Sequence, residues 1–390
     1  MKKTIIATAL LTLFAGSAAA QDWTWDTVKS NEDWTYSGDG QPYAGGVLHQ
    51  NEALQADETL KLTATEHEGP NYTANGLHST SENVTNNGLI YVLGGNSDYS
   101  MVGMTGGNEN GLTATNAGHI FVDSQNGAQV AAIGTTPNGK VVNSGTIEVK
   151  GKNSYGVISW AGNSKKPISI ENTGTIVAQG EGATAIRVGE VMGVGEEGDF
   201  GKVNTIVNEG NVLATDGAQA IVALAKDTQL KLQGQSNVVG VVEMGAETDL
   251  IVALENENNN STQLELKADK LRKVELQDST LEFTGAQSKY EFDSLSSEGD
   301  SQIRLIGNER TLKVNDLDGS VSLYSDHVSA GSTPVFAVDG IGADDQLNVT
   351  FGGNTADNIG DTSDLINVFN SSVAATDGTG NNAAYTGVIA

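Results

Sequence analysis

The sequence of 390 residues contains no cysteine, which excludes a disulfide framework, thiol catalysis and thiolate metal ligands. Aromatic residues make up only 5% and there are 5 prolines, so little bulky material is available for a thick core. Basic residues are also scarce, with 21 Lys and Arg against 49 Asp and Glu and a net charge of -28. This balance argues against binding to nucleic acid or to anionic lipid, because both require basic patches.

Long apolar runs are rare as well, and the clearest one lies at the N-terminus. Two lysines precede the apolar run from Ile5 to Phe14, and Ala18 and Ala20 then occupy the small-residue positions of a cleavage site. The run is too short to span a bilayer. These features predict a cleaved secretory signal over residues 1–20 and export of the protein through the inner membrane.

Glycine, in contrast, is abundant with 48 residues, and a short phrase, Asn-x-Gly-x followed by Ile or Val, occurs five times. The steps between successive asparagines are 30, 27, 29 and 36 residues. Such a period with variable spacing is typical of a solenoid with loops of variable length. The predicted repeat turns are formed by Asn86 and Gly88, Asn116 and Gly118, Asn143 and Gly145, Asn172 and Gly174, and Asn208 and Gly210.

Each copy of the phrase predicts a sharp turn followed by a strand. Asn and Gly both tolerate left-handed backbone angles, and the residues after them alternate, as Ile147 and Val149 do. Two further apolar pieces follow in each repeat, and a unit of about 30 residues cannot cover its own apolar face. We therefore predict an all-β fold, a single-stranded parallel β-helix with three short strands per rung. The asparagines of successive rungs are expected to stack as an amide ladder.

The repeats divide the chain into four parts. Beyond Gly217 the phrase fades, but alternating apolar pairs continue at a mean spacing of about 9.5 residues as far as Leu323, so we expect the same rung in both halves. A cluster of aromatics near the N-terminus, which includes Trp23 and Trp25, is expected to cap the solenoid; a carbohydrate-stacking platform is the alternative. The predicted parts are a signal peptide at 1–20, the aromatic cap at 21–46, the solenoid at 47–330, and an irregular, linker-like part at 331–390.

The sequence predicts no catalytic, cofactor-binding or metal-binding residue. Its five histidines are scattered and do not have metal-ligand spacing. Two acidic segments, 316–320 and 352–359, each match part of a calcium loop; we interpret both as acidic turns and leave calcium binding open. An enzymatic alternative, a β-helix polysaccharide lyase or glycoside hydrolase, would place Arg187 near Glu181 and Glu190.

The signal, the absence of cysteine and repeats such as N143-S-G-T-I-E-V-K-G and N172-T-G-T-I-V-A resemble the passenger domain of a Gram-negative autotransporter of the adhesin-like type. The resemblance implies a right-handed parallel β-helix displayed at the cell surface, outside the outer membrane, or secreted. Its implied role is non-enzymatic adhesion to host or neighbouring cells through a cell-surface, matrix or glycan ligand, with self-association as a further possibility. No nucleic-acid partner and no cofactor are expected.

One part of the family pattern is not found in this sequence. Autotransporter passengers are followed by a C-terminal translocator barrel, whereas the stretch before Ala390 is linker-like. Either the sequence is a fragment that ends before the translocator barrel, or the protein is released or anchored by another means. A purely structural spacer that binds nothing is a third hypothesis for the role of the solenoid.

Overall fold

The protein is described by a computed structural model. The chain divides into two units, Met1–Asp33 and Trp34–Ala390, and every described residue belongs to the second. The expected signal peptide, the aromatic cap apart from its last residue, Gly46, and the linker-like residues 371–384 lie outside the described residues. The described residues are 46–49, 53–63, 72–79, 82–94, 99–106, 111–124, 129–135, 138–160, 167–190, 204–255, 260–307, 309–326, 335–340, 345, 347–351 and 386–389.

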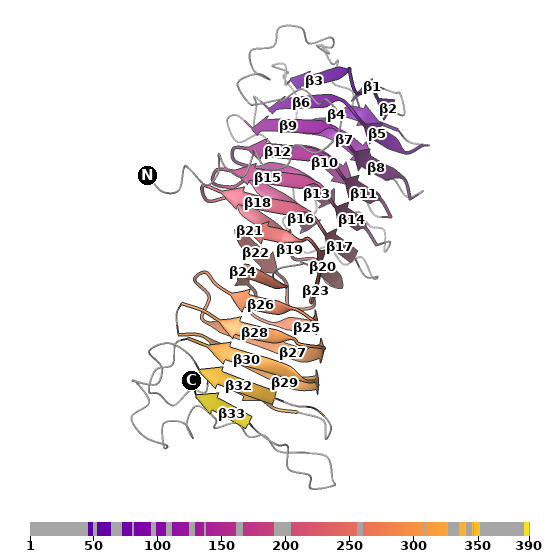
Figure 1. Ribbon diagram of the computed structural model, residues 1–390. Helices are drawn as coiled ribbons and strands as arrows, with labels where there is room; N and C mark the ends of the chain where they lie inside the picture. Colours follow the sequence, from indigo (N-terminus) through magenta and orange to yellow (C-terminus); the bar gives the residue numbers. More distant parts are fainter. Residues whose placement is uncertain are drawn as a thin grey trace. The chain divides into compact units, whose positions relative to one another are not determined.

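The described part of this unit is built from parallel strands, which Figure 1 shows stacked rung upon rung. None of the described residues forms a helix long and apolar enough to cross a membrane. The longest sheet has 14 strands: β1 (Gly46–His49), β4 (Tyr72–His78), β7 (Tyr99–Gly106), β10 (Gln129–Thr135), β13 (Ser154–Trp160), β16 (Thr184–Glu190), β19 (Gln219–Ala223), β22 (Val241–Met244), β24 (Ser261–Lys267), β26 (Thr280–Phe283), β28 (Gln302–Leu305), β30 (Val321–Ser325), β32 (Leu347–Phe351) and β33 (Thr386–Ile389).

Two further sheets complete the stack. The second sheet has 12 strands: β2 (Ala53–Leu54), β5 (Val84–Asn86), β8 (Thr113–Asn116), β11 (Lys140–Asn143), β14 (Ser169–Asn172), β17 (Asn204–Asn208), β20 (Thr228–Gly234), β23 (Asp249–Leu254), β25 (Leu271–Gln277), β27 (Lys289–Glu298), β29 (Thr311–Gly319) and β31 (Phe336–Val338). The third has seven: β3 (Thr59–Thr63), β6 (Leu89–Gly94), β9 (His119–Ser124), β12 (Thr146–Lys150), β15 (Thr175–Gln179), β18 (Asn211–Thr215) and β21 (Asn237–Val239).

The register of the ladders confirms the predicted fold class, a parallel β-helix. Ile120, Ile147 and Ile176 are direct partners in successive rungs of the third sheet. All three are fully buried in the hydrophobic core that runs through the stack. Because side chains alternate between the two faces of a strand, every second residue enters this shared core.

The repeat asparagines form the expected amide ladder at the corner between the second and third sheets. The Nδ2 of each asparagine donates to the Oδ1 of the next, and Asn208 donates to the hydroxyl of Ser236. The donor–acceptor distances are 2.7–2.8 Å, and no ladder asparagine is more than 1% exposed. Each buried amide is therefore satisfied by its neighbours, which is what burial of a polar group requires.

The turn glycines are needed for a different reason from the one expected. None of the five repeat glycines has a positive φ angle, so left-handed backbone is not their role. Instead, a Cβ atom on Gly145 would lie 2.1 Å from the carbonyl oxygen of Gly118 in the rung before, and one on Gly174 would lie 2.2 Å from the carbonyl oxygen of Gly145. Only a residue without a side chain lets the corners of successive rungs approach this closely.

The expectation that one rung runs through both halves was wrong for the C-terminal half. The third sheet ends at β21, and from β24 onward each rung contributes two strands. The partners Leu281 and Ile303 are 22 residues apart, compared with 27 for Ile120 and Ile147. Without an Asn-x-Gly corner each rung forms fewer strands, and those of the second sheet are longer, such as β27 with 10 residues.

The stack also continues past the boundary expected at residue 330. Strand β31 pairs with β29, β32 pairs with β30, and β33 pairs with β32, all in parallel. In β32, Leu347 and Val349 point into the same core as the earlier strands. The described residues of the predicted irregular part therefore extend the solenoid, because their alternating apolar residues fit the next rungs.

Candidate functional site

The place where the third sheet ends is also the site of a surface groove of about 540 Å³. One wall is formed by residues 236–240, in and beside β21, and the other by residues from β24, β26 and β28. A groove of this size falls within the usual range for small-molecule binding sites. It is therefore the best candidate for a binding site in the described part of the chain.

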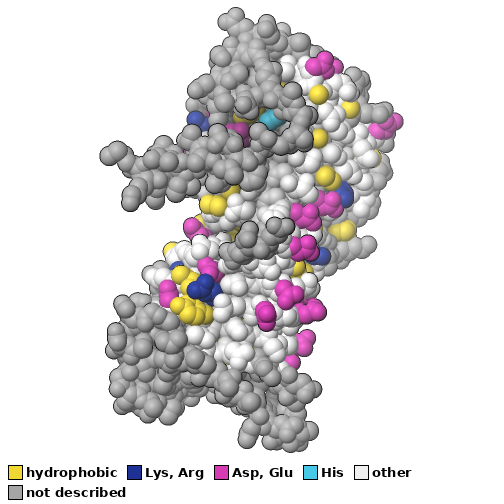
Figure 2. Space-filling model, in the orientation of Figure 1, with side chains coloured by type: hydrophobic (Ala, Val, Ile, Leu, Met, Phe, Trp, Pro, Cys, Tyr) yellow, Lys and Arg dark blue, Asp and Glu magenta, His cyan; other side chains and the backbone are white. Residues whose placement is uncertain are grey.

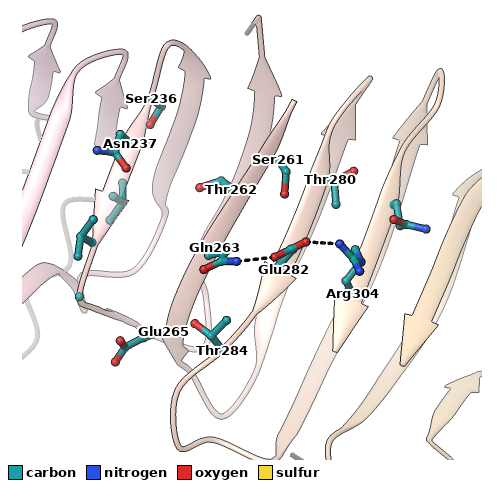
Figure 3. A pocket seen from close by; sticks show the side chains of 14 residues that line it. Ser236, Asn237, Ser261, Thr262, Gln263, Glu265, Thr280, Glu282, Thr284 and Arg304 are labelled. Carbon is teal, nitrogen blue, oxygen red and sulfur yellow. Dashed lines mark hydrogen bonds and ion pairs between the residues drawn. The ribbon is translucent and has the colours of Figure 1, made fainter. Parts of the chain in front are cut away.

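The groove arises because β24 changes its neighbour along its length. Residues 265–267 of β24 pair with β22 in the rung before, whereas residues 261–264 pair with β26 in the rung after. Strand β21 is the terminal strand of its sheet and pairs only with β18. The first half of β24 therefore pairs with no strand of the rung before, and the groove begins between it and β21 and continues over β26 and β28 (Figure 3).

The outward-facing side chains of the adjoining strands form a chain of contacts across the rungs. Gln263 Nε2 donates to Glu282 Oε2 at 2.7 Å, and Arg304 Nη1 donates to Glu282 Oε1 (Figure 3). The guanidinium of Arg304 also lies 4.6 Å from the ring centroid of Tyr324, a cation–π contact. Both oxygens of the Glu282 carboxylate, which is 7% exposed, are therefore engaged.

Other polar groups in the groove have no partner among the described residues. The side chains of Ser261, Thr262, Thr280, Thr284 and Gln302 line the groove and make no hydrogen bond to another described residue. Thr262 is only 6% exposed, because it lies on the same face of β24 as the buried Leu264, at the floor of the groove. The hydroxyl of Thr262 has no hydrogen-bond partner among the described residues and is not one of their fully buried unpaired atoms, so it is available to a ligand or to water.

The residues singled out in the sequence are not brought together in this groove. The asparagine ladder lies at a corner of the core, although its last acceptor, Ser236, is also a groove residue. Arg187, expected beside two glutamates in the enzymatic alternative, has its guanidinium 5.7 Å from the ring centroid of Tyr155. Glu181 lies in an exposed turn of the same rung.

The first acidic segment is not the turn that we expected. Asp316 and Asp318 lie within strand β29, where both are exposed on its outer face. The register of this strand with β27 explains the difference, because Leu317 between the two aspartates is buried opposite Leu295. The second segment, 352–359, lies outside the described residues. Across the described ranges no group of three or more His, Asp or Glu side chains is arranged to hold a metal ion.

Sequence reasoning did not identify the groove residues. Gln263, Glu282 and Arg304 lie 19 and 22 residues apart in the chain and belong to no repeated phrase. The available signal was the loss of the Asn-x-Gly phrase after Gly210, which marks where the third sheet is about to end. The loss of the phrase indicates that the regular stack is interrupted, but it does not indicate which side chains surround the interruption.

We compared the chain with known protein families, curated proteins and solved structures. No protein-family model, no curated protein and no solved structure matches this chain.

Proposed function

We propose that this protein is an exported, non-enzymatic β-helix that acts at the cell surface or after secretion by binding a ligand on host or neighbouring cells. The signal-like residues 1–20 and the repeats that resemble an autotransporter passenger domain support export and display. The groove between β21 and β24 supports binding, because it presents polar groups that have no partner among the described residues on a rigid scaffold.

The engagement of Glu282 is the observation that favours binding over catalysis. Glycoside hydrolysis generally requires two carboxyl groups, one to donate a proton and one to act as nucleophile or base. In the groove, the oxygens of Glu282 already accept hydrogen bonds from Gln263 and Arg304. Glu265 is the other carboxylate of the groove, and it points away from Glu282 (Figure 3). This arrangement suits a fixed polar surface better than a catalytic pair.

The distribution of charge fits a partner that is not strongly anionic. On the face shown in Figure 2, acidic side chains are scattered over both parts of the stack, and the described Lys and Arg side chains do not gather into a patch. Such a surface repels nucleic acid and anionic lipid. It leaves cell-surface glycans, matrix proteins or a second copy of the chain as candidate partners.

Binding of the purified protein to cells, to immobilised matrix proteins and to a glycan array tests the proposal. We expect saturable binding to at least one of these surfaces and no release of reducing sugar from the polysaccharides tested in parallel. Turnover of a polysaccharide that disappears in a Glu282→Gln or Glu265→Gln variant would instead establish the enzymatic alternative. Absence of binding to every surface would favour a structural spacer.

A further inference from the structure

We propose that the groove between β21 and β24 binds a neutral oligosaccharide, and that Thr262 and Gln302 donate or accept hydrogen bonds to its hydroxyl groups. This inference rests on the proposed binding function and adds to it the site and the class of ligand. It is argued from three properties of the groove: its uncommitted polar groups, its charge and its exposed apolar side chain.

The uncommitted polar groups match a ligand that carries many hydroxyls. Four hydroxyl side chains and the amide of Gln302 line the groove without a partner among the described residues. Hydroxyl groups both donate and accept, and an amide offers two donors and one acceptor. A saccharide hydroxyl has the same dual character, so each of these side chains can pair with a hydroxyl of a bound saccharide.

Gln263 and Asn237 add acceptors whose orientation is already fixed. Gln263 uses its Nε2 on Glu282, and Asn237 uses its Nδ2 on Asn211 at 3.1 Å. The carbonyl oxygen of each amide is then left as an acceptor beside the groove. Because both side chains are held by neighbouring rungs, little conformational entropy is lost when a ligand binds.

The charge of the groove selects against an acidic ligand. Arg304, the basic residue of the lining, is paired with Glu282, whereas Glu265 is exposed and has no partner among the described residues. The uncompensated charge in the groove is therefore negative. A uronic acid or sulfated sugar would be repelled by Glu265, while a neutral sugar would not.

An exposed valine gives the groove a small apolar surface. Within the described part of the chain, Val239 is the one large hydrophobic side chain that is well exposed, at 46%. It lies in the groove wall beside Asn237. A pyranose ring carries hydroxyls at its edge and C–H groups on its faces, so an apolar side chain next to polar ones suits its mixed surface.

Calorimetric titration of the purified protein tests the proposal. Maltotetraose, cellotetraose and chitotetraose serve as neutral probes, tetragalacturonate as an acidic probe of equal length, and an extended peptide of alternating Thr and Val as a competing class. We expect saturable binding of a neutral probe, weakened about fivefold to tenfold by Thr262→Val, because the variant removes one hydrogen bond and keeps the shape. Gln302→Ala is expected to have a similar effect.

Thr205→Val is the matched control, since Thr205 lies on β17 of the second sheet, outside the groove lining. It should leave affinity unchanged, and all variants should retain the wild-type melting temperature. Failure of every neutral probe to bind, equal binding by Thr262→Val, or preference for the acidic probe or the peptide would overturn the proposal. If Thr262→Val binds cells as well as the wild type does, the groove is not the binding site, but the proposed binding function is retained. If a bound probe is cleaved, the protein is an enzyme, but the groove is retained as its binding site.

Discussion

The N-terminal and C-terminal parts of the stack differ in the side chains that connect successive rungs at their corners. From β2 to β21, rungs of three strands are joined at a corner where buried asparagines hydrogen-bond to one another. From β24 onward, rungs of two strands lack this ladder. In these rungs the side-chain contacts lie at the corner between the first and second sheets, where Gln287 hydrogen-bonds to the N–H and C=O of Ala268 in the rung before, and Arg310 donates to the carbonyl oxygens of Gly285 and Ile306.

The two corners differ in how far their chemistry repeats. An asparagine amide has a donor and an acceptor, so identical side chains can be stacked indefinitely. The side-chain-to-backbone bonds of Gln287 and Arg310 each connect two rungs only. Arg310 is 2% exposed, which makes its charge costly to bury even with two carbonyl partners. The asparagine corner therefore recurs in every rung from Asn86 to Asn208, although the steps vary from 27 to 36 residues, whereas the rungs between β24 and β32 are 19 to 26 residues long and share no corner motif.

The largest expected loss of stability follows from adding a side chain at a corner glycine of the N-terminal part. Gly145→Ala would place a Cβ atom 2.1 Å from the carbonyl oxygen of Gly118, where rigid backbone leaves no room. We expect destabilisation of about 3 kcal/mol or more, measured as faster hydrogen exchange in the strands adjoining β11 and β12. Gly307→Ala is the control: no atom lies within 4 Å of the added Cβ, but φ is +85°, so only about 1 kcal/mol of backbone strain is expected. An equal effect of the two substitutions would contradict this explanation.

Breaking the ladder at its centre should have the next largest effect. Asn143→Ala removes the bonds to Asn116 and Asn172 and leaves a buried donor and a buried acceptor unpaired. We expect a loss of about 2–3 kcal/mol, read from denaturant unfolding and from exchange confined to the N-terminal part. Asn315→Ala in the C-terminal part loses one bond to the partly exposed Asp293, and should change stability by less than about 1 kcal/mol. Similar losses for both asparagines would argue against a special role for the ladder.

Removal of the C-terminal corner contact should have a smaller and more local effect. Gln287→Ala leaves the N–H and C=O of the buried Ala268 without their side-chain partner. We expect about 1–2 kcal/mol, less than for Asn143→Ala because water can reach the partly exposed site. Hydrogen exchange should accelerate between β24 and β27 and stay unchanged before β21. Acceleration throughout the stack would mean that the two parts unfold together.

The smallest expected effect concerns an ion pair on the outer face of the C-terminal part. A hydrogen bond and charge attraction from Lys270, at 2.6 Å, lower the pKa of Asp293 below its ordinary value of 3.8. A lowered carboxyl pKa in the folded state stabilises the protein above pH 3.8, and this contribution disappears as the pH falls through the lowered pKa. NMR titration should show that Lys270→Met raises the pKa of Asp293. The melting temperature at neutral pH should hardly change, because solvent screens the pair.

The sequence by itself determined the fold class and the register of the N-terminal part. A phrase that recurs every 27 to 36 residues, with alternating apolar positions behind it, leaves stacking in register as the way to bury every apolar face. The asparagine ladder follows from the same register, because equivalent residues in parallel rungs lie one above the other. Asn116, Asn143 and Asn172 could therefore be placed in a single file without knowledge of the structure.

Three features are determined only by the tertiary structure: the close contact between rungs that requires glycine at the corner, the position where the third sheet ends, and the set of side chains that line the groove. Gly145 and Gly118 belong to different rungs, so the short distance between them cannot be predicted from the sequence around either residue. The division of β24 between two neighbours depends on how far the C-terminal corners turn the chain, and these corners share no motif. Gln263, Glu282 and Arg304 meet only because three strands from different rungs reach the same outer face there, so their juxtaposition is a property of the stacked chain rather than of any segment within it.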